Sequence, residues 1–322
     1  MSVSRVAVRA GYRLHLGFYR YLDGDMAYGS IGLALEEPYL ELRAAIDAGG
    51  SERLEVRAPT KESEEAVSRV ARYLGVSSGS LEVSGYLRHH VGLGSITRVC
   101  LATAIAFSLA LRKPDLDLED MLVKLGRCRY SCVGYYTFVY GGLAVDTGVR
   151  IPEGGPPRPL LLTKFPRSWY VVLAIPEGRG LGEAEEDPYM RSPTPVSEQG
   201  ELYRALAEVL TGVKLERIDM FVRGIETIQR VAGRYFSQAQ GATFSSPYGD
   251  IIAEAMRESG LRGIGQSSWG PAVYGFSNDY VAAELARRRI LSALDRLGVS
   301  CDVWVSRASE LGYSAHVSGL RT

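Results

Sequence analysis

Residues 89–98 carry the residue types that bind anions. Gly92 and Gly94 permit a tight turn, Ser95 can cap a helix, and the run 99–111 has the composition of a buried helix. Such a turn directs several backbone amides toward one point, at the positive end of the helix dipole. The sequence therefore predicts a phosphate or pyrophosphate site here. The same turn also serves as a plain helix cap, and the spacing alone leaves both uses open.

Cationic side chains flank this turn and other glycine-rich segments. Residues 5–9 and residues 12–16 each alternate between polar and apolar residues, which predicts short strands joined through a bulge or bend at Gly11. Arg13 and His15 share one face of the second run, between Gly11 and Gly17. A solvated strand face explains them as well as an anionic ligand does. The remaining candidates are Arg98, Arg127, Arg129 and Arg179, the last of which follows a buried strand and also suits an ordinary connecting loop. Because a guanidinium can grip a phosphate with two hydrogen bonds, these residues predict phosphate or carboxylate recognition.

Several familiar catalytic motifs are missing from the sequence. It contains no Gly-x-x-x-x-Gly-Lys-[Ser/Thr] phosphate loop and no dinucleotide fingerprint after a first strand. Neither a His-Glu-x-x-His helix nor a Gly-x-Ser-x-Gly elbow is present. With four histidines in all, chemistry based on histidine-bound metal has little to work with. With these motifs absent, the glycine-rich turns indicate phosphate binding as the main function to consider.

The composition is that of an ordinary globular protein, with 46% hydrophobic and 23% charged residues. Lys plus Arg and Asp plus Glu number 37 each, so no overall field favours nucleic acid or a membrane surface. The apolar run 99–111 is too short to cross a bilayer, and no signal-peptide core follows Met1, which predicts a cytoplasmic protein. Cys128 and Cys132 lack partners for a zinc site and are expected to be buried thiols. A disulfide is the alternative if the source is an intracellular hyperthermophile.

The order of elements predicts an α+β protein rather than a repeating βαβ one. Strand patterns dominate the first part of the chain, and helical patterns follow at residues 62–74, 95–111 and 116–125. A segment rich in Pro and Gly at 151–159 suits a linker. Beyond it, the order strand, helices, two strands, helix, strand is compatible with a split βαβ sandwich. We therefore expect an N-terminal domain over 1–160 with the phosphate-binding loop and a C-terminal ferredoxin-like domain over 161–322.

The chain resembles the GHMP kinase superfamily and, within it, the archaeal β-ribofuranosylaminobenzene 5'-phosphate synthase family. The matching segments occur in the family's order and span nearly the whole chain. They are Arg13-Leu14-His15-Leu16-Gly17, residues 30–38 (Ser-Ile-Gly-Leu-Ala-Leu-Glu-Glu-Pro), residues 90–95 (His-Val-Gly-Leu-Gly-Ser), Tyr140-Gly141-Gly142, residues 176–180 (Pro-Glu-Gly-Arg-Gly) and residues 265–271 (Gly-Gln-Ser-Ser-Trp-Gly-Pro).

The resemblance implies a two-domain GHMP fold and a transferase of methanopterin-type cofactor biosynthesis. Phosphoribosyl pyrophosphate would condense with a 4-aminobenzoate or 4-hydroxybenzoate type of acceptor, with loss of pyrophosphate and CO2. Mg²⁺ would assist, its ligands being unknown, and a homodimer would form. The resemblance assigns catalytic roles to Arg13, His15, Arg127 and Arg179. It assigns phosphate binding to Gly92, Leu93, Gly94, Ser95, Ile96, Thr97 and Arg98, and substrate binding to Arg129, Ser131, Glu177, Gln266, Ser267, Ser268 and Trp269. Trp269 could stack on a planar acceptor, although a core position explains it too.

Three segments depart from the family pattern. Ile96 and Arg98 replace a Gly and a Gln of the family's phosphate loop. Residues 26–32 lack an Arg and an Asp that the family has there. Residues 130–134 read Tyr-Ser-Cys-Val-Gly, where the family has Thr/Arg-Ser-Gly-Ile-Gly. Ile96 would restrict the backbone and narrow the anion pocket. These changes keep two alternatives open. One is an ATP-dependent small-molecule kinase, although the run 127–136 lacks the Asp that such enzymes use as a base. The other is a non-catalytic protein that binds a phosphorylated metabolite.

Overall fold

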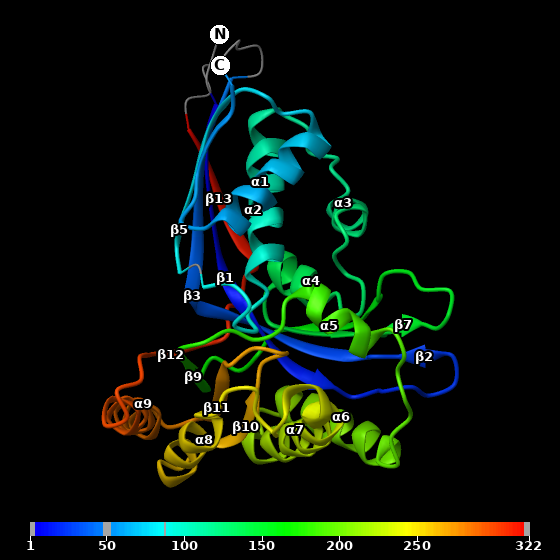
Figure 1. Ribbon diagram of the computed structural model, residues 1–322, viewed down its shortest axis with the longest axis vertical. Coiled ribbons are helices and arrows are strands. Elements are labelled where there is room, and N and C mark those ends of the chain that lie inside the picture. Colours follow the sequence, from blue (N-terminus) through cyan, green and yellow to red (C-terminus); the bar gives the residue numbers. More distant parts are fainter. Residues whose placement is uncertain (1–3, 48–52, 87, 319–322) are drawn as a thin grey trace.

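The structure, a computed structural model, describes residues 4–47, 53–86 and 88–318. The strand expected to end at Leu87 therefore reaches the edge of the described part, and Met1 lies outside it. Figure 1 shows a long, bent sheet with helices against one side in the upper part, and a second layer of strands and helices below. The protein is α+β, as predicted.

The strands are β1 (Ser4–Phe18), β2 (Met26–Ala27), β3 (Ser30–Ile46), β4 (Glu55–Arg57), β5 (Gly79–Gly85), β6 (Leu143–Asp146), β7 (Val149–Arg150), β8 (Pro159–Thr163), β9 (Tyr170–Pro176), β10 (Arg262–Gln266), β11 (Val273–Ser277), β12 (Cys301–Ser306) and β13 (Tyr313–Ser318). The helices are α1 (Lys61–Leu74), α2 (Ser95–Ala110), α3 (Leu118–Lys124), α4 (Val133–Tyr140), α5 (Glu183–Met190), α6 (Gln199–Lys214), α7 (Ile218–Gln240), α8 (Gly249–Glu258) and α9 (Tyr280–Asp295).

The first sheet is built on the long antiparallel pair β1 and β3. Its order is β13-β1-β3-β5-β4, with β6 pairing with β3 and β8 pairing with β6. The expected pairs of short strands are single long strands, and the register of β1 shifts after Gly11 and after His15. A Cβ at Gly11 would lie 1.7 Å from the carbonyl oxygen of Leu35, so only glycine fits. The predicted bulge at this glycine is confirmed, and it sets the bend that brings Arg13 and His15 toward the centre of the molecule.

Helix α2 is the buried helix of this half. It packs against β1 and β3 and against α1 and α4, so nearly all of its side chains lie away from water. This explains the absence of a polar face in residues 99–111. Helix α1 is amphipathic and is capped by Thr60, whose hydroxyl accepts from the amide of Ser63.

The second sheet has the predicted split βαβ topology. Its order is β10-β11-β9-β12, all antiparallel. Strand β9 alternates between its two faces: Val172 and Ala174 pack with α8 and α9, whereas Val171, Leu173 and Ile175 belong to the main core. Because both faces are covered, β9 reads as a continuous apolar run.

The two halves share one large core. Helix α7 packs against β1 as well as β10, and strands β8 and β13, from beyond residue 158, complete the first sheet. The division at residue 160 therefore stays a prediction, since the chain returns to the first sheet at its end. In the described residues no helix is long and apolar enough to cross a membrane.

Candidate anion and acceptor site

A cavity of about 340 Å³ lies where the two halves meet, and we call it the anion pocket. This size falls in the range of roughly 300–1,000 Å³ usual for small-molecule sites. It is lined by the start of α2, residues of α1 and α5, a turn after β10, and residues 127–131, here named the arginine loop. The predicted site residues in its wall are Arg13, His15, Gly92, Gly94, Ser95, Ile96, Thr97, Arg127, Arg129, Ser131, Ser268 and Trp269.

The start of α2 is arranged to receive an anion. Its N-cap is Gly94, in a left-handed conformation with φ 69°, so no side chain caps the helix, and the first turn holds no acidic residue. The amides of a first helical turn have no acceptor within the helix. The Ser95 hydroxyl is held by the ring of His89 at 2.7 Å, and that ring also meets Thr60 and Ser63. Ile96 takes a helical backbone, so its amide keeps its place in the first turn while its side chain lines the pocket.

A glycine turn from the second half locks this loop in place. A Cβ at Gly92 would lie 1.9 Å from the carbonyl oxygen of Ser267, and one at Gly270 would lie 2.0 Å from the carbonyl carbon of Val91. The Ser267 hydroxyl accepts from the amide of His15 at 3.0 Å and donates to the carbonyl of Gly92 at 2.7 Å. Ser267 thus joins three segments far apart in the sequence without lining the cavity.

Arg13 supplies a buried positive charge to the pocket. One Nη donates to the Gly92 carbonyl at 2.9 Å, while the buried Nε–H has no hydrogen-bond partner. Burial lowers the pKa of Arg13 to about 10, against the attraction of Glu186 and Asp146, so the group is charged at neutral pH. An unsatisfied buried donor is costly unless a ligand occupies it.

His15 is a neutral ring beside this charge. Burial, with the neighbouring Arg13, holds the pKa of His15 well below its usual value. Its Nδ1 accepts from the amide of Gly17 at 3.3 Å, which assigns the ring proton to Nε2. His15 can therefore donate a hydrogen bond but carries no charge.

The arginine loop forms the opposite wall. Arg129 pairs with Asp187 on α5 at 2.5 Å, the Tyr130 hydroxyl donates to the same carboxylate at 2.8 Å, and the Ser131 hydroxyl meets Ser30 at 2.7 Å. The expectation that both loop cysteines are free thiols is wrong, because Cys128 and Cys132 form a disulfide. Their Cα atoms are 4.4 Å apart, a spacing that a bridge can span.

Asp146, which sequence reasoning missed, anchors this wall from behind. Its buried carboxylate accepts from the amides of Ser30, Cys132 and Gly148 and from the Ser30 hydroxyl, at 2.8–3.1 Å. Burial raises the pKa of Asp146 to about 6, although these hydrogen bonds lower it. An aspartate ending an apolar strand was the only signal in the sequence, and it does not reveal the four donors.

Some predicted site residues lie outside the pocket wall in the described part of the chain. The Arg98 guanidinium is buried against α4, donating to the Gly134 carbonyl at 2.7 Å and to the Thr137 hydroxyl at 2.9 Å. Arg179 forms two hydrogen bonds with Glu185, at 2.7 and 3.1 Å. Leu93 is a core residue and Glu177 is exposed. The sequence shows that Arg98 lies in a helix, but it does not show whether the side chain points toward the pocket or toward α4.

A second cavity of about 510 Å³, the aromatic pocket, adjoins the first. His15, Phe18, Ser268 and Trp269 line both cavities. Trp269 is only 6% exposed and packs on Phe236, with ring centroids 4.3 Å apart, so it is both a core residue and a pocket wall. Gln266 lines the aromatic pocket with its amide engaged by Ser245, Gln240 and Ser268. Most of the remaining lining comes from α7, α8 and β10, with Gly17 of β1 and the connecting residues Thr243, Phe244 and Leu261.

Comparison with known proteins shows that the chain is similar to two synthases. It is 29% identical to the beta-ribofuranosylphenol 5'-phosphate synthase of Archaeoglobus fulgidus, over 96% of this chain and 99% of that protein. It is 27% identical to the synthase of the same name from Methanothermobacter thermautotrophicus, over 86% and 90% of the two chains. The chain is therefore similar to these synthases along most of its length.

The structure also has the fold of the GHMP kinases. Homoserine kinase from Cytophaga hutchinsonii superposes with a TM-score of 0.70 over 97% of both chains, at 16% identity. Identity at this level establishes the shared fold only. No model of a known protein family matches the sequence.

Proposed function

We propose that this protein is a phosphoribosyl transferase that joins phosphoribosyl pyrophosphate to a 4-hydroxybenzoate or 4-aminobenzoate type of acceptor. The observation that carries the proposal is the shared wall: a pocket with helix amides and buried Arg13 opens beside an aromatic pocket, across His15, Phe18 and Trp269. The synthase relatives supply the reaction class.

The reaction requires one pocket to stabilise the negative charge of the departing pyrophosphate and the other to bury the acceptor ring. The C1'–O bond to pyrophosphate breaks and leaves an oxocarbenium-like ribose. The ring carbon that bears the carboxylate then bonds to C1', and the C–C bond to that carboxylate breaks with its electron pair returning to the ring. Pyrophosphate and CO2 leave, and no net proton is taken up. Fixed donors near a leaving anion are among the strongest catalytic contributions.

We assign the pyrophosphate to the anion pocket. The amides at Ser95, Ile96 and Thr97 and the guanidinium of Arg13 would bind it, with Arg129 exchanging Asp187 for a phosphate oxygen. The Nε2–H of neutral His15 would stand at the boundary of the two pockets and donate to an oxygen of either substrate without adding a charge.

We assign the acceptor to the aromatic pocket. Phe18 and Trp269 offer flat faces to a benzene ring at the shared wall. Charged residues such as Arg230 and Arg262 line part of this pocket, but its apolar wall at Phe18, Phe236 and Trp269 would exclude water from the oxocarbenium-like ribose. It also favours departure of a poorly solvated carboxylate as CO2, because burial penalises the charged form.

The residues present fit a Mg²⁺ ion shared with substrate. No group of three His, Cys, Asp or Glu side chains in the described ranges forms a metal cage. Mg²⁺ is commonly held by one or two carboxylates plus substrate phosphates. Glu62 and Glu65, which line the anion pocket from α1, would hold it there. When bound, the ion would neutralise charge on the departing pyrophosphate.

The kinase alternative lacks an aspartate in the arginine loop that could act as a base. Asp146, which binds this loop from behind, is fully buried with its oxygens committed to backbone amides. The carboxylates in the wall, Glu62, Glu65 and Glu186, belong to α1 and α5. We therefore rank phosphoryl transfer from ATP second, although the homoserine kinase fold keeps it testable.

Product analysis tests the proposal. The protein is incubated with phosphoribosyl pyrophosphate, Mg²⁺ and 4-hydroxybenzoate labelled in its carboxyl carbon. We expect labelled CO2 and pyrophosphate in equal amounts. ADP formed from ATP and an added alcohol would support the kinase, and calorimetric binding of phosphoribosyl pyrophosphate without turnover would support a metabolite-binding protein. Light scattering on the same sample tests the homodimer, which we also propose.

A further inference from the structure

All residues of the arginine loop face one cavity. The five consecutive positions 127–131 line the anion pocket, and none of them lines the aromatic pocket. The Cys128–Cys132 bond closes this segment into a small ring that contains Arg129, Tyr130 and Ser131. The bond therefore restrains residues that the pocket uses, in a segment outside any regular helix or strand.

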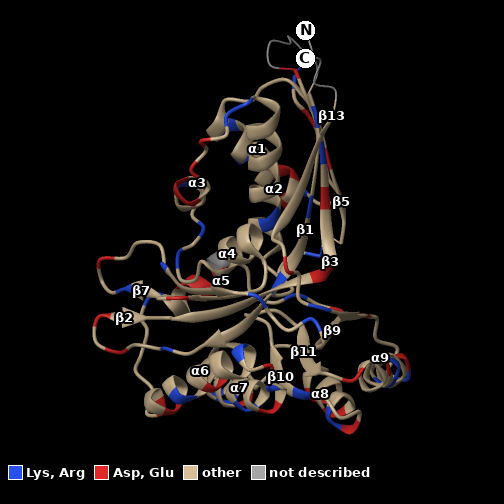
Figure 2. Ribbon diagram, turned by 180° about the vertical axis from the view of Figure 1, so that it is seen from behind, with Lys and Arg blue, Asp and Glu red and all other residues tan. Residues whose placement is uncertain are grey.

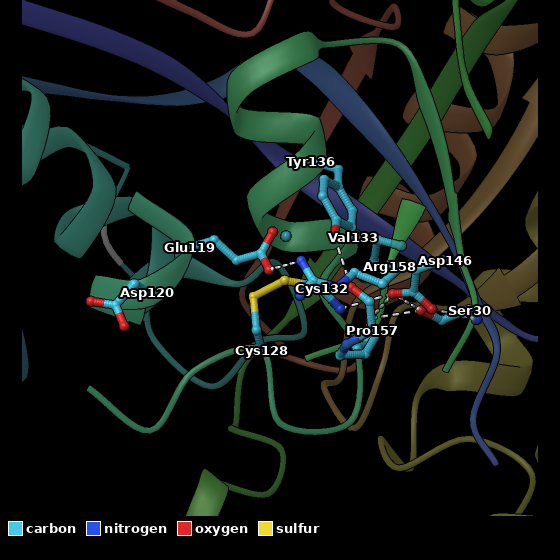
Figure 3. The surroundings of a disulfide bond; sticks show 12 residues. Ser30, Glu119, Asp120, Cys128, Cys132, Val133, Tyr136, Asp146, Pro157 and Arg158 are labelled. Atoms are coloured by element: carbon cyan, nitrogen blue, oxygen red, sulfur yellow. Dashed lines mark hydrogen bonds and ion pairs between the residues drawn. A yellow bond between two sulfur atoms is a disulfide. The ribbon is translucent and has the colours of Figure 1, made fainter. Parts of the chain in front are cut away.

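One end of the bond is firmly anchored. Cys132 is fully buried, and its amide donates to the Asp146 carboxylate at 2.8 Å. Asp146 ends β6 and also holds Ser30 at the start of β3, so Cys132 is tied to the first sheet. Figure 3 shows the disulfide beside this Asp146 and Ser30 cluster, at the foot of α4.

The other end depends on the bond for its conformation. Cys128 adopts a left-handed backbone with φ 56°, a region that side chains other than those of Gly, Asn and Asp rarely enter. It lies in the connection between α3 and α4, outside any regular element. A rare conformation persists only where its surroundings impose it. The covalent link to the anchored Cys132 supplies that restraint.

We propose that Cys128 and Cys132 are positioning residues, whose disulfide holds the arginine loop in the geometry that binds a phosphorylated ligand. Reduction by a dithiol would take up two electrons and two protons from that reagent, giving two thiols and leaving the reagent oxidised. The loop would keep its contacts with Asp187 and Ser30 but would sample more conformations, so binding an anion would cost more ordering. The inference rests on the proposed function only for the identity of the ligand.

The experiment measures the affinity for inorganic pyrophosphate by calorimetry, with the disulfide intact and after reduction with dithiothreitol. We expect reduction to weaken binding about tenfold, the loss of one well-placed charged contact. The Cys128→Ala/Cys132→Ala variant should match the reduced protein and should not respond to dithiothreitol. The Cys301→Ser variant, altered at a cysteine outside both pockets, should respond as the unmodified chain does.

Two further readouts separate positioning from mere stabilisation. Circular dichroism at the titration temperature must show both forms folded, and the affinity for 4-hydroxybenzoate should be unchanged, because the loop does not line the aromatic pocket. Equal pyrophosphate affinity before and after reduction would overturn the inference, as would absence of binding in both forms. Alkylation of all four cysteines in the denatured, unreduced protein would overturn it too. A redox effect on pyrophosphate binding without synthase turnover would leave the inference standing and remove the proposed activity.

Discussion

At the scale of single residues, two arginines that pair with the same helix differ in their relation to the anion pocket. Arg129 and Arg179 both pair with carboxylates of α5, Asp187 and Glu185, and both side chains are well exposed, at 48% and 61%. The exposed Arg179–Glu185 pair contributes little to stability. The Asp187 carboxylate is only 11% exposed, and it is also bound by Arg191 and Tyr130. Only Arg129 lines the anion pocket. Both arginines were candidates for anion binding because of their residue type and a nearby glycine. Only the fold shows that one of them lines the pocket.

The account predicts that Arg129→Ala weakens pyrophosphate binding about tenfold, because a charged hydrogen bond to the ligand is lost. Arg179→Ala is the matched control and should change affinity less than about twofold. Melting temperatures of both variants should stay close to that of the unmodified protein. Calorimetry decides: if Arg179→Ala has the larger effect, the anion is bound elsewhere.

Asp146 gives a prediction about stability and pH. In Asp146→Asn the new amide group would face backbone N–H groups of Ser30, Cys132 and Gly148, so at least one donor loses its acceptor. We expect the free energy of unfolding at pH 7 to fall by about 2–4 kcal/mol. Denaturant titration measures this. A change below about 0.5 kcal/mol would show that the carboxylate is not an anchor.

The pH dependence follows from the pKa of Asp146, raised by burial from 3.8 to about 6. Between these values the folded state holds a proton that the unfolded state has released, so this group's contribution to stability falls as pH rises through the window. From pH 7 to pH 5 it should add about 1 kcal/mol in the unmodified protein and nothing in Asp146→Asn. Paired denaturant titrations at the two pH values test the sign, and the opposite sign would contradict the assignment.

At the scale of elements, the site depends on how closely two turns approach. The backbone contact of Gly92 with Ser267, and of Gly270 with Val91, leaves no room for a Cβ. This contact positions the amides of α2 beside residues from the second half of the chain. The two glycine-rich turns that contain Gly92 and Ser267 are 175 residues apart in the sequence, yet they form one structural unit.

Gly270→Ala should disrupt this unit. A methyl group 2.0–2.2 Å from backbone atoms of Val91 and Gly92 forces the turns apart. We expect pyrophosphate binding to be lost and the free energy of unfolding to drop by about 3 kcal/mol. The control is Gly200→Ala in α6, where no atom lies within 4 Å of the added methyl group and binding should be unchanged. Unaltered binding in Gly270→Ala would show that the contact does not shape the site.

The sequence predicted most elements because their signals are local. Alternation along β1 and β3, the glycine bulge at Gly11 and the apolar composition of α2 each depend on near neighbours. The phosphate-binding turn was found for the same reason. The role of Asp146 and the inward direction of Arg98 were not found, and the disulfide was only an alternative to buried thiols, because each depends on partners brought together by the tertiary fold. Strand β13 was missed although residues 313–318 (Tyr-Ser-Ala-His-Val-Ser) alternate between apolar and polar residues.

At the scale of the whole molecule, charge is balanced while the pockets are specialised. Figure 2 shows Lys and Arg interspersed with Asp and Glu along the helices of the lower layer, in keeping with equal totals of 37 each. An anionic substrate is therefore not attracted by the overall field, and its recognition depends on the local group around Arg13 and α2. Residues of both halves of the chain line the anion pocket, so the pocket forms only when the two halves pack together.

A fragment comprising residues 1–160 should consequently fail to fold cooperatively. It lacks β13, which pairs with β1, and α7, which covers β1 from below. It would also leave the site without its glycine turn. Circular dichroism against temperature tests this, with the full chain as control. A sharp transition of the fragment near that of the full chain would show that the first half is an independent domain.

The most direct test of the central claim is a crystal structure of the full chain with phosphoribosyl pyrophosphate. The account predicts the pyrophosphate group within hydrogen-bond distance of the amides of Ser95 to Thr97 and of the Arg13 guanidinium, with the ribose carbon C1' directed toward Trp269. Density for the ligand at another place, with Ile96 filling the start of α2, would contradict it.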